Sequence, residues 1–89
     1  MAQHHDTALR KQIGNRLRDL RMHAGITSQE KLAHSAGVHR TAVGRLERGE
    51  SGVTIEVLAA VLAPLEVSLG DFFQPFKEPV PPRTPKRQR

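Results

Sequence analysis

The residues of this chain best suited to chemistry lie close together, between positions 40 and 48. In a helix over 39–48, Val43 and Leu46 would face inward, so the opposite side would carry cationic groups beside short side chains. Guanidinium groups are permanent hydrogen-bond donors, and threonine both donates and accepts, so this face is suited to binding a polar or anionic partner. Its residues are Arg40, Thr41, Gly44, Arg45 and Arg48.

The sequence offers little for catalysis or metal binding. It shows no nucleophile–base pairing, paired carboxylates or glycine-rich phosphate loop, so we expect no enzyme. Of the five histidines, two are terminal, and the others fall on different expected elements without a His-x₃-His repeat. The absence of cysteine excludes disulfides and zinc fingers and fits a reducing cytosol. We therefore expect no metal, no cofactor and no small-molecule ligand.

Charge and apolar content restrict the class of partner and the cellular compartment that we expect for this protein. Five of the 14 Lys and Arg residues lie beyond residue 75, with one acidic residue, so the net charge of +5 belongs mostly to the end of the chain. The three aromatic residues are phenylalanines near that end, which excludes an RNA-binding sheet with stacking platforms and favours duplex DNA. The longest apolar stretch, 57–65, is too short to span a bilayer, and the amino terminus lacks the pattern of a secretion signal. We expect a cytoplasmic, nucleoid-associated protein with no membrane partner.

Helices must position the candidate residues, because no useful run of β-type alternation occurs in the sequence. Apolar residues recurring every three or four positions predict an amphipathic helix over 7–24, which Gly25 ends. Thr27 and Glu30 have the spacing of a capping box, so a second helix over about 28–35 begins at a cap that is Thr27 or Ser28. Gly37 then supplies the positive φ that a tight turn between helices requires.

Three further caps are indicated by hydrophobic staples, in which an apolar residue before the cap meets one four positions into the helix. They predict helices over about 39–48, 55–63 and 69–74, with Gly49 closing the first and Pro64 bending the end of the second. The sequence thus predicts an all-α, compact five-helix domain over 7–75, between a flexible segment 1–6 and a Pro-rich, basic, disordered tail 76–89. The expected caps are His39, Thr54 and Ser68.

Two short helices joined by a glycine-containing turn can place the second helix in the major groove of DNA. The runs 28–33, 36–49 and 54–73 resemble the phage-repressor/Cro helix-turn-helix family, often labelled the xenobiotic-response-element type, and the likeness covers residues 9–73. The Arg-Thr pair and the following Leu-Glu-Arg-Gly are similar to the controller proteins of restriction–modification systems. The resemblance implies a repressor-like transcription regulator that binds double-stranded DNA as a homodimer on an inverted-repeat operator.

The resemblance also implies roles for individual positions. Gln29 would contact a phosphate and brace the recognition helix, and Glu47 would pair with a basic residue of the first helix, for which Arg16 is the candidate. Two alternatives stay open, namely that Arg45 pairs with Glu47 or Glu50 instead of a base, and that Arg40 is only a solvated charge. The implied base-reading residues are Arg40, Thr41, Gly44 and Arg45, and the implied phosphate-binding residues are Gln29, Arg48, Arg10, Lys11 and Thr54.

The segment 55–73 carries more apolar residues than the core of a small domain needs, so part of it is expected to form a dimer interface. The alternative is that all of these residues belong to the core. The expected interface residues are Val61, Leu65, Leu69 and Phe73.

Two rival functions remain open for the protein. One is an antitoxin that holds a toxin through the segment from Phe76 onward, and the other is a protein-interaction module with a vestigial helix-turn-helix.

Overall fold

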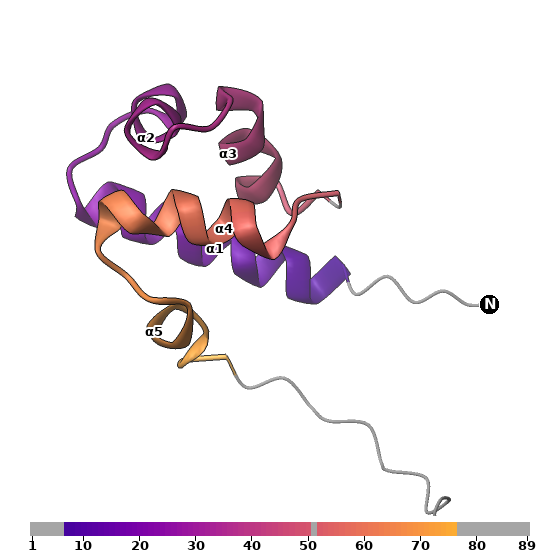
Figure 1. Cartoon of the computed structure of the whole chain (residues 1–89). Coiled ribbons are helices and arrows are strands. Elements are labelled where there is room, and N and C mark those ends of the chain that lie inside the picture. The colour runs from indigo at the N-terminus through magenta and orange to yellow at the C-terminus, as the bar shows by residue number, and fades with distance from the viewer. Residues whose placement is uncertain (1–6, 51, 77–89) are drawn as a thin grey trace, which may run out of the picture.

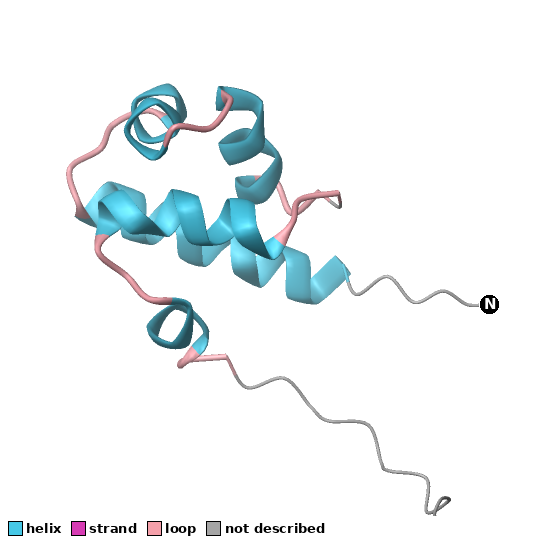
Figure 2. Ribbon diagram, viewed as in Figure 1, coloured by secondary structure: helices cyan, strands magenta, loops and turns pink. Residues whose placement is uncertain are grey.

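Helices joined by loops make up the described part of the chain, residues 7–50 and 52–76 of the computed structural model, and no strand occurs among these residues (Figure 2). The prediction of an all-α fold is therefore confirmed, and every helix begins and ends within one residue of its expected bounds. The segment 1–6, expected to be flexible, and residues 77–89 of the tail, expected to be disordered, lie outside the described residues. Phe76, expected to begin the tail, instead packs against the core, with its ring centre 5.1 Å from that of Phe73, so the start of the tail was placed one residue too early. The elements are α1 (Thr7–His23), α2 (Gln29–Ala36), α3 (Arg40–Glu47), α4 (Ile55–Leu62), the 3₁₀ turn η1 (Ala63–Leu65) and α5 (Leu69–Phe73).

Every α-helix contributes at least one fully buried side chain to a single core. Figure 1 shows α2 and α3 at one end of the domain and α5 at the other, with α1 and α4 between them. Helix α3 packs against both α1 and α2, so its position is fixed from two sides. Burying each of these side chains contributes on the order of 1.5–3 kcal/mol to folding. The largest are Leu17, Leu32, Val43, Val61, Leu62 and Phe72.

Polar side chains begin four of the helices by accepting a hydrogen bond from a backbone N–H in the first turn. His39 Nδ1 accepts from the Thr41 amide at 3.2 Å, Thr54 Oγ1 from that of Val57 at 3.2 Å and Ser68 Oγ from that of Asp71 at 3.0 Å. These three caps are confirmed. At α2 the cap is Ser28, whose Oγ accepts from the amide of Lys31 at 3.0 Å.

The Thr27–Glu30 capping box is therefore wrong. Since α2 begins one residue later than that pattern requires, Glu30 occupies the second helical position and not the third, from which a side chain reaches back to its cap.

Glycine and proline end the helices as the sequence indicates. Gly37, between α2 and α3, has φ +72°, and Gly49, after α3, has φ +74°, a region in which side chains with a Cβ are strained. Helix α4 stops at Leu62 and continues as η1, because Pro64 has no N–H to extend the α-helical ladder.

Candidate nucleic-acid interface

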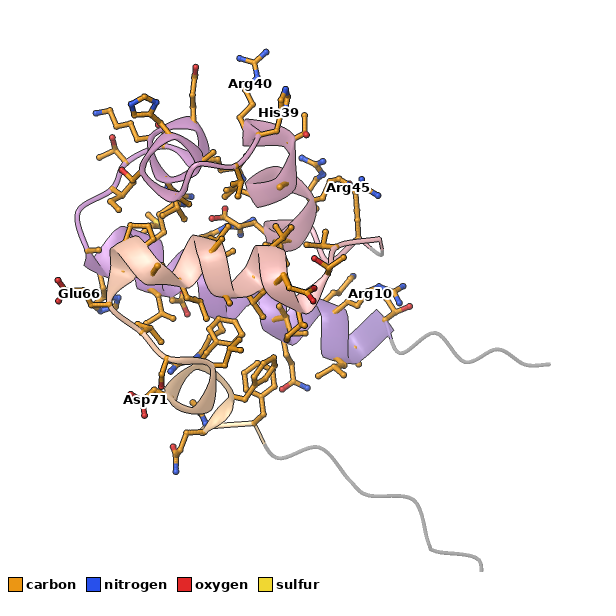
Figure 3. The ribbon with its side chains drawn as sticks, viewed as in Figure 1. Arg10, His39, Arg40, Arg45, Glu66 and Asp71 are labelled. Carbon is orange, nitrogen blue, oxygen red and sulfur yellow. The ribbon has the colours of Figure 1, made fainter. Side chains whose placement is uncertain are left out.

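The outer face of α3 presents three arginines to solvent. The side chains of Arg40, Arg45 and Arg48 are 68%, 46% and 56% exposed, whereas Val43 and Leu46 on the other side of the helix are buried. Figure 3 shows Arg40, at the start of α3, and Arg45, further along the same helix, pointing away from the body of the domain. The structure thus places these side chains outward, as the sequence pattern predicts.

Gly44 differs from these arginines, because it is buried and not exposed. A Cβ added at Gly44 would lie 3.0 Å from a terminal nitrogen of Arg48 and 3.2 Å from Oε1 of Gln29. These two side chains therefore cover the backbone at this position. Gly44 therefore lies on the outer face, as expected, and lines the hollow between α2 and α3, but it is not exposed, because the side chains of Arg48 and Gln29 close over it.

A polar hollow of about 520 Å³ lies between α2 and α3 and brings together most of the residues singled out by sequence. Gln29 and Glu30 line it from α2, and Arg40, Thr41 and Arg48 line it from α3. Arg40 also lies 3.9 Å from a carboxylate oxygen of Glu30, an exposed pair that contributes little to stability. The hollow can accept an anionic or hydrogen-bonding group, because arginines, hydroxyl groups and the amide of Gln29 line it beside the single carboxylate of Glu30.

Behind this face, a buried carboxylate ties three helices together. Nε and a terminal nitrogen of Arg21, on α1, donate to the two carboxylate oxygens of Glu47, on α3, at 2.7 and 3.1 Å. Gln29 Nε2, on α2, donates to the same carboxylate at 2.9 Å. The Glu47 side chain has no exposed surface, and that of Arg21 is 9% exposed. A third donor of Arg21 binds the carbonyl of Ile26 at 3.0 Å, and Arg18 lies 3.6 Å from the carboxylate.

Burial by itself raises the pKa of Glu47, but the hydrogen bonds from Arg21 and Gln29 and the charges of Arg21 and Arg18 outweigh it, so the pKa is lowered from its ordinary value. Glu47 therefore stays ionised, and α3 is braced by a charged, fully paired group.

Arg16 is not the partner of Glu47. Its Nε donates to the carbonyl of Phe72 at 2.8 Å and a terminal nitrogen donates to that of Asp71 at 2.9 Å, so it satisfies carbonyls at the end of α5. Its guanidinium also lies 5.8 Å from the centre of the Phe72 ring. The expected pairing fails because Arg16 points towards α5, whereas Arg21 lies on the side of α1 that faces α3.

Arg45 and Arg48 share one acidic partner, Glu50. Arg48 Nε donates to Glu50 at 2.5 Å, and Arg45 Nε lies 3.7 Å from its other carboxylate oxygen. The pKa of Glu50 is lowered, first by the hydrogen bond from Arg48. Of the two partners considered for Arg45, Glu50 is the one found.

The remaining phosphate-binding candidates lie at the edge of this surface. Arg10 Nε donates to the carbonyl of Gly49 at 3.0 Å, which links the start of α1 to the loop after α3, and Figure 3 shows Arg10 on the same side of the molecule as Arg45. Lys11 is exposed, and so is Thr54, whose hydroxyl caps α4. Gln29 faces Glu47, so it braces α3 directly.

The four expected interface residues divide into two groups. Val61 has no exposed surface and belongs to the core, so its place at an interface is wrong. Leu65, Leu69 and Phe73 are only partly buried, and they pack around the core from η1 and α5. Phe73 lies edge-on to Phe72, with ring centres 4.9 Å apart.

Sequence reasoning missed the roles of Arg21 and Gly14, and it considered Glu50 as a partner of Arg45 but not of Arg48. A Cβ on Gly14 would lie 2.5 Å from the carbonyl oxygen of Glu47, so this glycine permits the close approach of α1 and α3. A signal for Arg21 was present, since it follows Leu17 by four residues and so continues the apolar stripe of α1.

Neither a metal site nor a membrane-spanning helix occurs in the described part of the chain. Within 7–50 and 52–76, no group of three or more His, Asp or Glu residues is arranged to hold a metal ion. The same residues contain no helix with the length and apolar character needed to cross a membrane.

The fold and this surface define a helix-turn-helix domain, with α2 and α3 as the motif and α3 as its exposed second helix. The helix-turn-helix family HTH_3 matches residues 17–72, and the chain belongs to this family. The resemblance drawn from the sequence is thereby confirmed. No curated protein was found to match the chain.

Solved structures similar to the chain include three regulators. An HTH_3 family transcriptional regulator from Vibrio cholerae is 37% identical, with a TM-score of 0.68, and the match covers 79% of this chain but 39% of the Vibrio chain. The restriction–modification controller protein C.AhdI from Aeromonas hydrophila is 35% identical, with a TM-score of 0.68 over 74% of this chain and 98% of its own. The clp gene regulator ClgR from Corynebacterium glutamicum is 33% identical, with a TM-score of 0.65 over 74% and 83%.

Proposed function

We propose that this protein is a transcription regulator that binds double-stranded DNA sequence-specifically, as a homodimer on an inverted-repeat operator. The observation that carries the proposal is the cationic outer face of α3, held in place from behind by the buried Glu47 with Arg21 and Gln29. A rigid support matters because base readout needs side chains held within a fraction of an ångström of the base edges. The similar structures of a transcriptional regulator and a restriction–modification controller protein support the same function.

In this proposal, Arg40, Thr41 and Arg45 read base edges in the major groove. Arginine can bind O6 and N7 of guanine with two hydrogen bonds, and threonine can meet a thymine methyl group or donate its hydroxyl hydrogen. The backbone at Gly44 reaches a base only if the Gln29 and Arg48 side chains move aside, a small rearrangement of flexible side chains.

Phosphate contacts fix the position of α3 on the duplex. Arg48 and Gln29 provide them from the hollow between α2 and α3, and Arg10 and Lys11 from the start of α1. The first backbone N–H groups of α4, after Thr54, add a further anion-binding end.

A dimer supplies the second recognition helix. Leu65, Leu69 and Phe73 form the proposed contact. Binding to an inverted repeat requires the two α3 helices of the dimer to enter successive major grooves, roughly 34 Å apart.

The experiment is selection of binding sites from random duplex DNA, followed by affinity measurements on the selected operator and on a scrambled duplex. We expect Arg45→Ala to weaken operator binding by about 1–3 kcal/mol and to relax the selected sequence at one position. Arg48→Ala should weaken binding to both duplexes and reduce the salt dependence by about one phosphate contact.

Lys31→Ala removes the same charge from the exposed side of α2 and serves as the matched control. Failure of the wild-type protein to enrich any sequence, or equal effects of Arg45→Ala and Lys31→Ala, would contradict the proposal.

A further inference from the structure

Glu50 is held in a defined place at the end of the recognition helix. Gly49 adopts φ +74°, and the N–H groups of Gly49 and Glu50 donate to the carbonyls of Leu46 and Arg45 at 3.1 and 2.9 Å. This pair of bonds is the Schellman arrangement, which folds the chain back over the last turn of a helix. Because the backbone of Glu50 is fixed in this way, its carboxylate is directed onto the last turn of α3.

The carboxylate of Glu50 meets the two arginines that serve DNA in the proposed function. One oxygen accepts from Arg48 Nε at 2.5 Å, and the other lies 3.7 Å from Arg45 Nε. A DNA phosphate bound by the same edge of Arg48 would have to occupy the position of this carboxylate. Glu50 and phosphate therefore compete for Arg48.

The loop after Glu50 also leaves room for Arg45. A Cβ placed on Gly52 would lie 2.7 Å from a terminal nitrogen of Arg45, and Gly52 has φ +89°. The guanidinium of Arg45 thus lies between the carboxylate of Glu50 and the backbone of Gly52. Glu50 and Gly52 therefore contribute separately to the arrangement of Arg45.

We propose that Glu50 is a specificity-determining residue that occupies the phosphate-binding edges of Arg48 and Arg45 and so opposes binding to DNA of the wrong sequence. The inference rests on the proposed function, because it assigns Arg45 to a base and Arg48 to a phosphate. On a wrong sequence both arginines can only serve phosphates, and Glu50 competes with both. On the operator, Arg45 is bound to a base edge, so Glu50 competes with phosphate only at Arg48.

The test compares Glu50→Gln with the wild-type protein on two duplexes, the selected operator and a scrambled sequence of the same length, over a series of salt concentrations. We expect Glu50→Gln to bind the scrambled duplex about threefold to tenfold more tightly, with a salt slope steeper by about 0.9 for each additional phosphate that the protein neutralises. The operator affinity should rise less, so the ratio of operator to scrambled affinity should fall at least about threefold.

Glu66→Gln is the matched control, since it removes the same charge from an exposed glutamate that Figure 3 shows on the opposite side of the molecule from Arg45. It should leave the ratio of operator to scrambled affinity unchanged. Far-ultraviolet circular dichroism verifies the fold of both variants, and because the side chain of Glu50 is 45% exposed, we expect it intact.

Three results would overturn the inference. They are unchanged affinities and slope for Glu50→Gln, an equal effect of Glu66→Gln, and a loss of operator affinity with the scrambled affinity unchanged, which would make Glu50 a support for Arg45. If instead the wild-type protein does not distinguish any operator from the scrambled duplex, the proposed function itself fails. The two failures are therefore distinguishable.

Discussion

At the scale of single residues, Glu47 is the polar group of the site that connects the most helices. It is fully buried, and it accepts hydrogen bonds from Arg21 and Gln29, so α1, α2 and α3 all depend on it. Removing one partner of a buried ion pair leaves the other charge without compensation, which typically lowers the free energy of unfolding by about 3–5 kcal/mol. We expect Glu47→Gln to have an effect at the lower end of this range, because its amide retains one acceptor.

The same carboxylate makes stability depend on pH. Because the pKa of Glu47 in the folded chain is lowered below its ordinary value of 4.5, the unfolded chain binds a proton more readily than the folded one. The stabilisation is complete above about pH 4.5 and is lost as the pH falls through the folded pKa. Urea unfolding at a series of pH values measures this effect. Below pH 4.5, the free energy of unfolding should fall less steeply with decreasing pH in Glu47→Gln than in the wild-type protein. Equal slopes would contradict this assignment.

Residue by residue, the sequence predicts conformation better than pairing. The caps His39, Thr54 and Ser68 were predictable because a cap depends on a side chain and on amides two or three residues away. The partner of Glu47 was not, since Arg16 and Arg21 both lie on α1 and only the packing of α1 on α3 decides between them. Glu50 was considered for Arg45 but not for Arg48, because its approach to Arg48 depends on how the chain folds back at Gly49.

At the scale of elements, the position of α3 depends on how closely α1 approaches it. The contact occurs at Gly14, where an added Cβ would lie 2.5 and 2.6 Å from the carbonyl oxygens of Glu47 and Leu46. Glycine in a helix is unfavourable by about 1 kcal/mol relative to alanine, so helix propensity alone would favour Gly14→Ala. The backbone of α3 cannot yield as a flexible side chain can. We expect Gly14→Ala to lower the free energy of unfolding by about 1–3 kcal/mol in spite of its better propensity.

A second helical glycine provides the control. Gly70 lies on the exposed side of α5, and the nearest atom to an added Cβ there is Ser68 Oγ at 3.9 Å. Gly70→Ala should therefore raise the free energy of unfolding by about 0.5–1 kcal/mol, the gain expected from propensity alone. Chemical denaturation of both variants measures the difference. Stabilisation by Gly14→Ala would show that α1 and α3 are less tightly packed than the structure has them.

The elements also show where sequence periodicity stops being informative. The spacing of apolar residues, as a stripe in α1 and as staples at the starts of α3, α4 and α5, together with the capping signal before α2, located all five helices to within one residue. The same pattern cannot say whether an apolar residue meets its own core or another subunit. Val61 and Leu65 were both expected at an interface, yet Val61 is wholly buried while Leu65 is partly exposed, since the chain turns into η1 between them.

At the scale of the whole molecule, the partly exposed residues of η1 and α5 decide whether two copies associate. Arg16 holds α5 against α1 through the carbonyls of Asp71 and Phe72, so this short helix is fixed before any partner arrives. We expect Phe73→Asp to convert the proposed dimer into a monomer in analytical ultracentrifugation, because a charge would be buried without a partner in the contact. Circular dichroism checks that the variant keeps its helices. Ile55→Asp, at an apolar residue that is 54% exposed on α4 outside the proposed contact, should remain dimeric.

The monomeric variant also allows DNA recognition by one subunit to be measured separately from the pairing of two subunits. Its α3 face is unchanged, so it should bind a single half-site with an affinity close to that of one subunit of the wild-type dimer. On the full operator, the wild-type protein engages both half-sites at once, and the second contact benefits from the high effective concentration that the first one creates. Phe73→Asp should therefore lose at least about a hundredfold in affinity for the full operator while its binding to a half-site changes little. Equal losses on the two duplexes would mean that α5 supports the DNA-binding face itself and not the pairing of subunits.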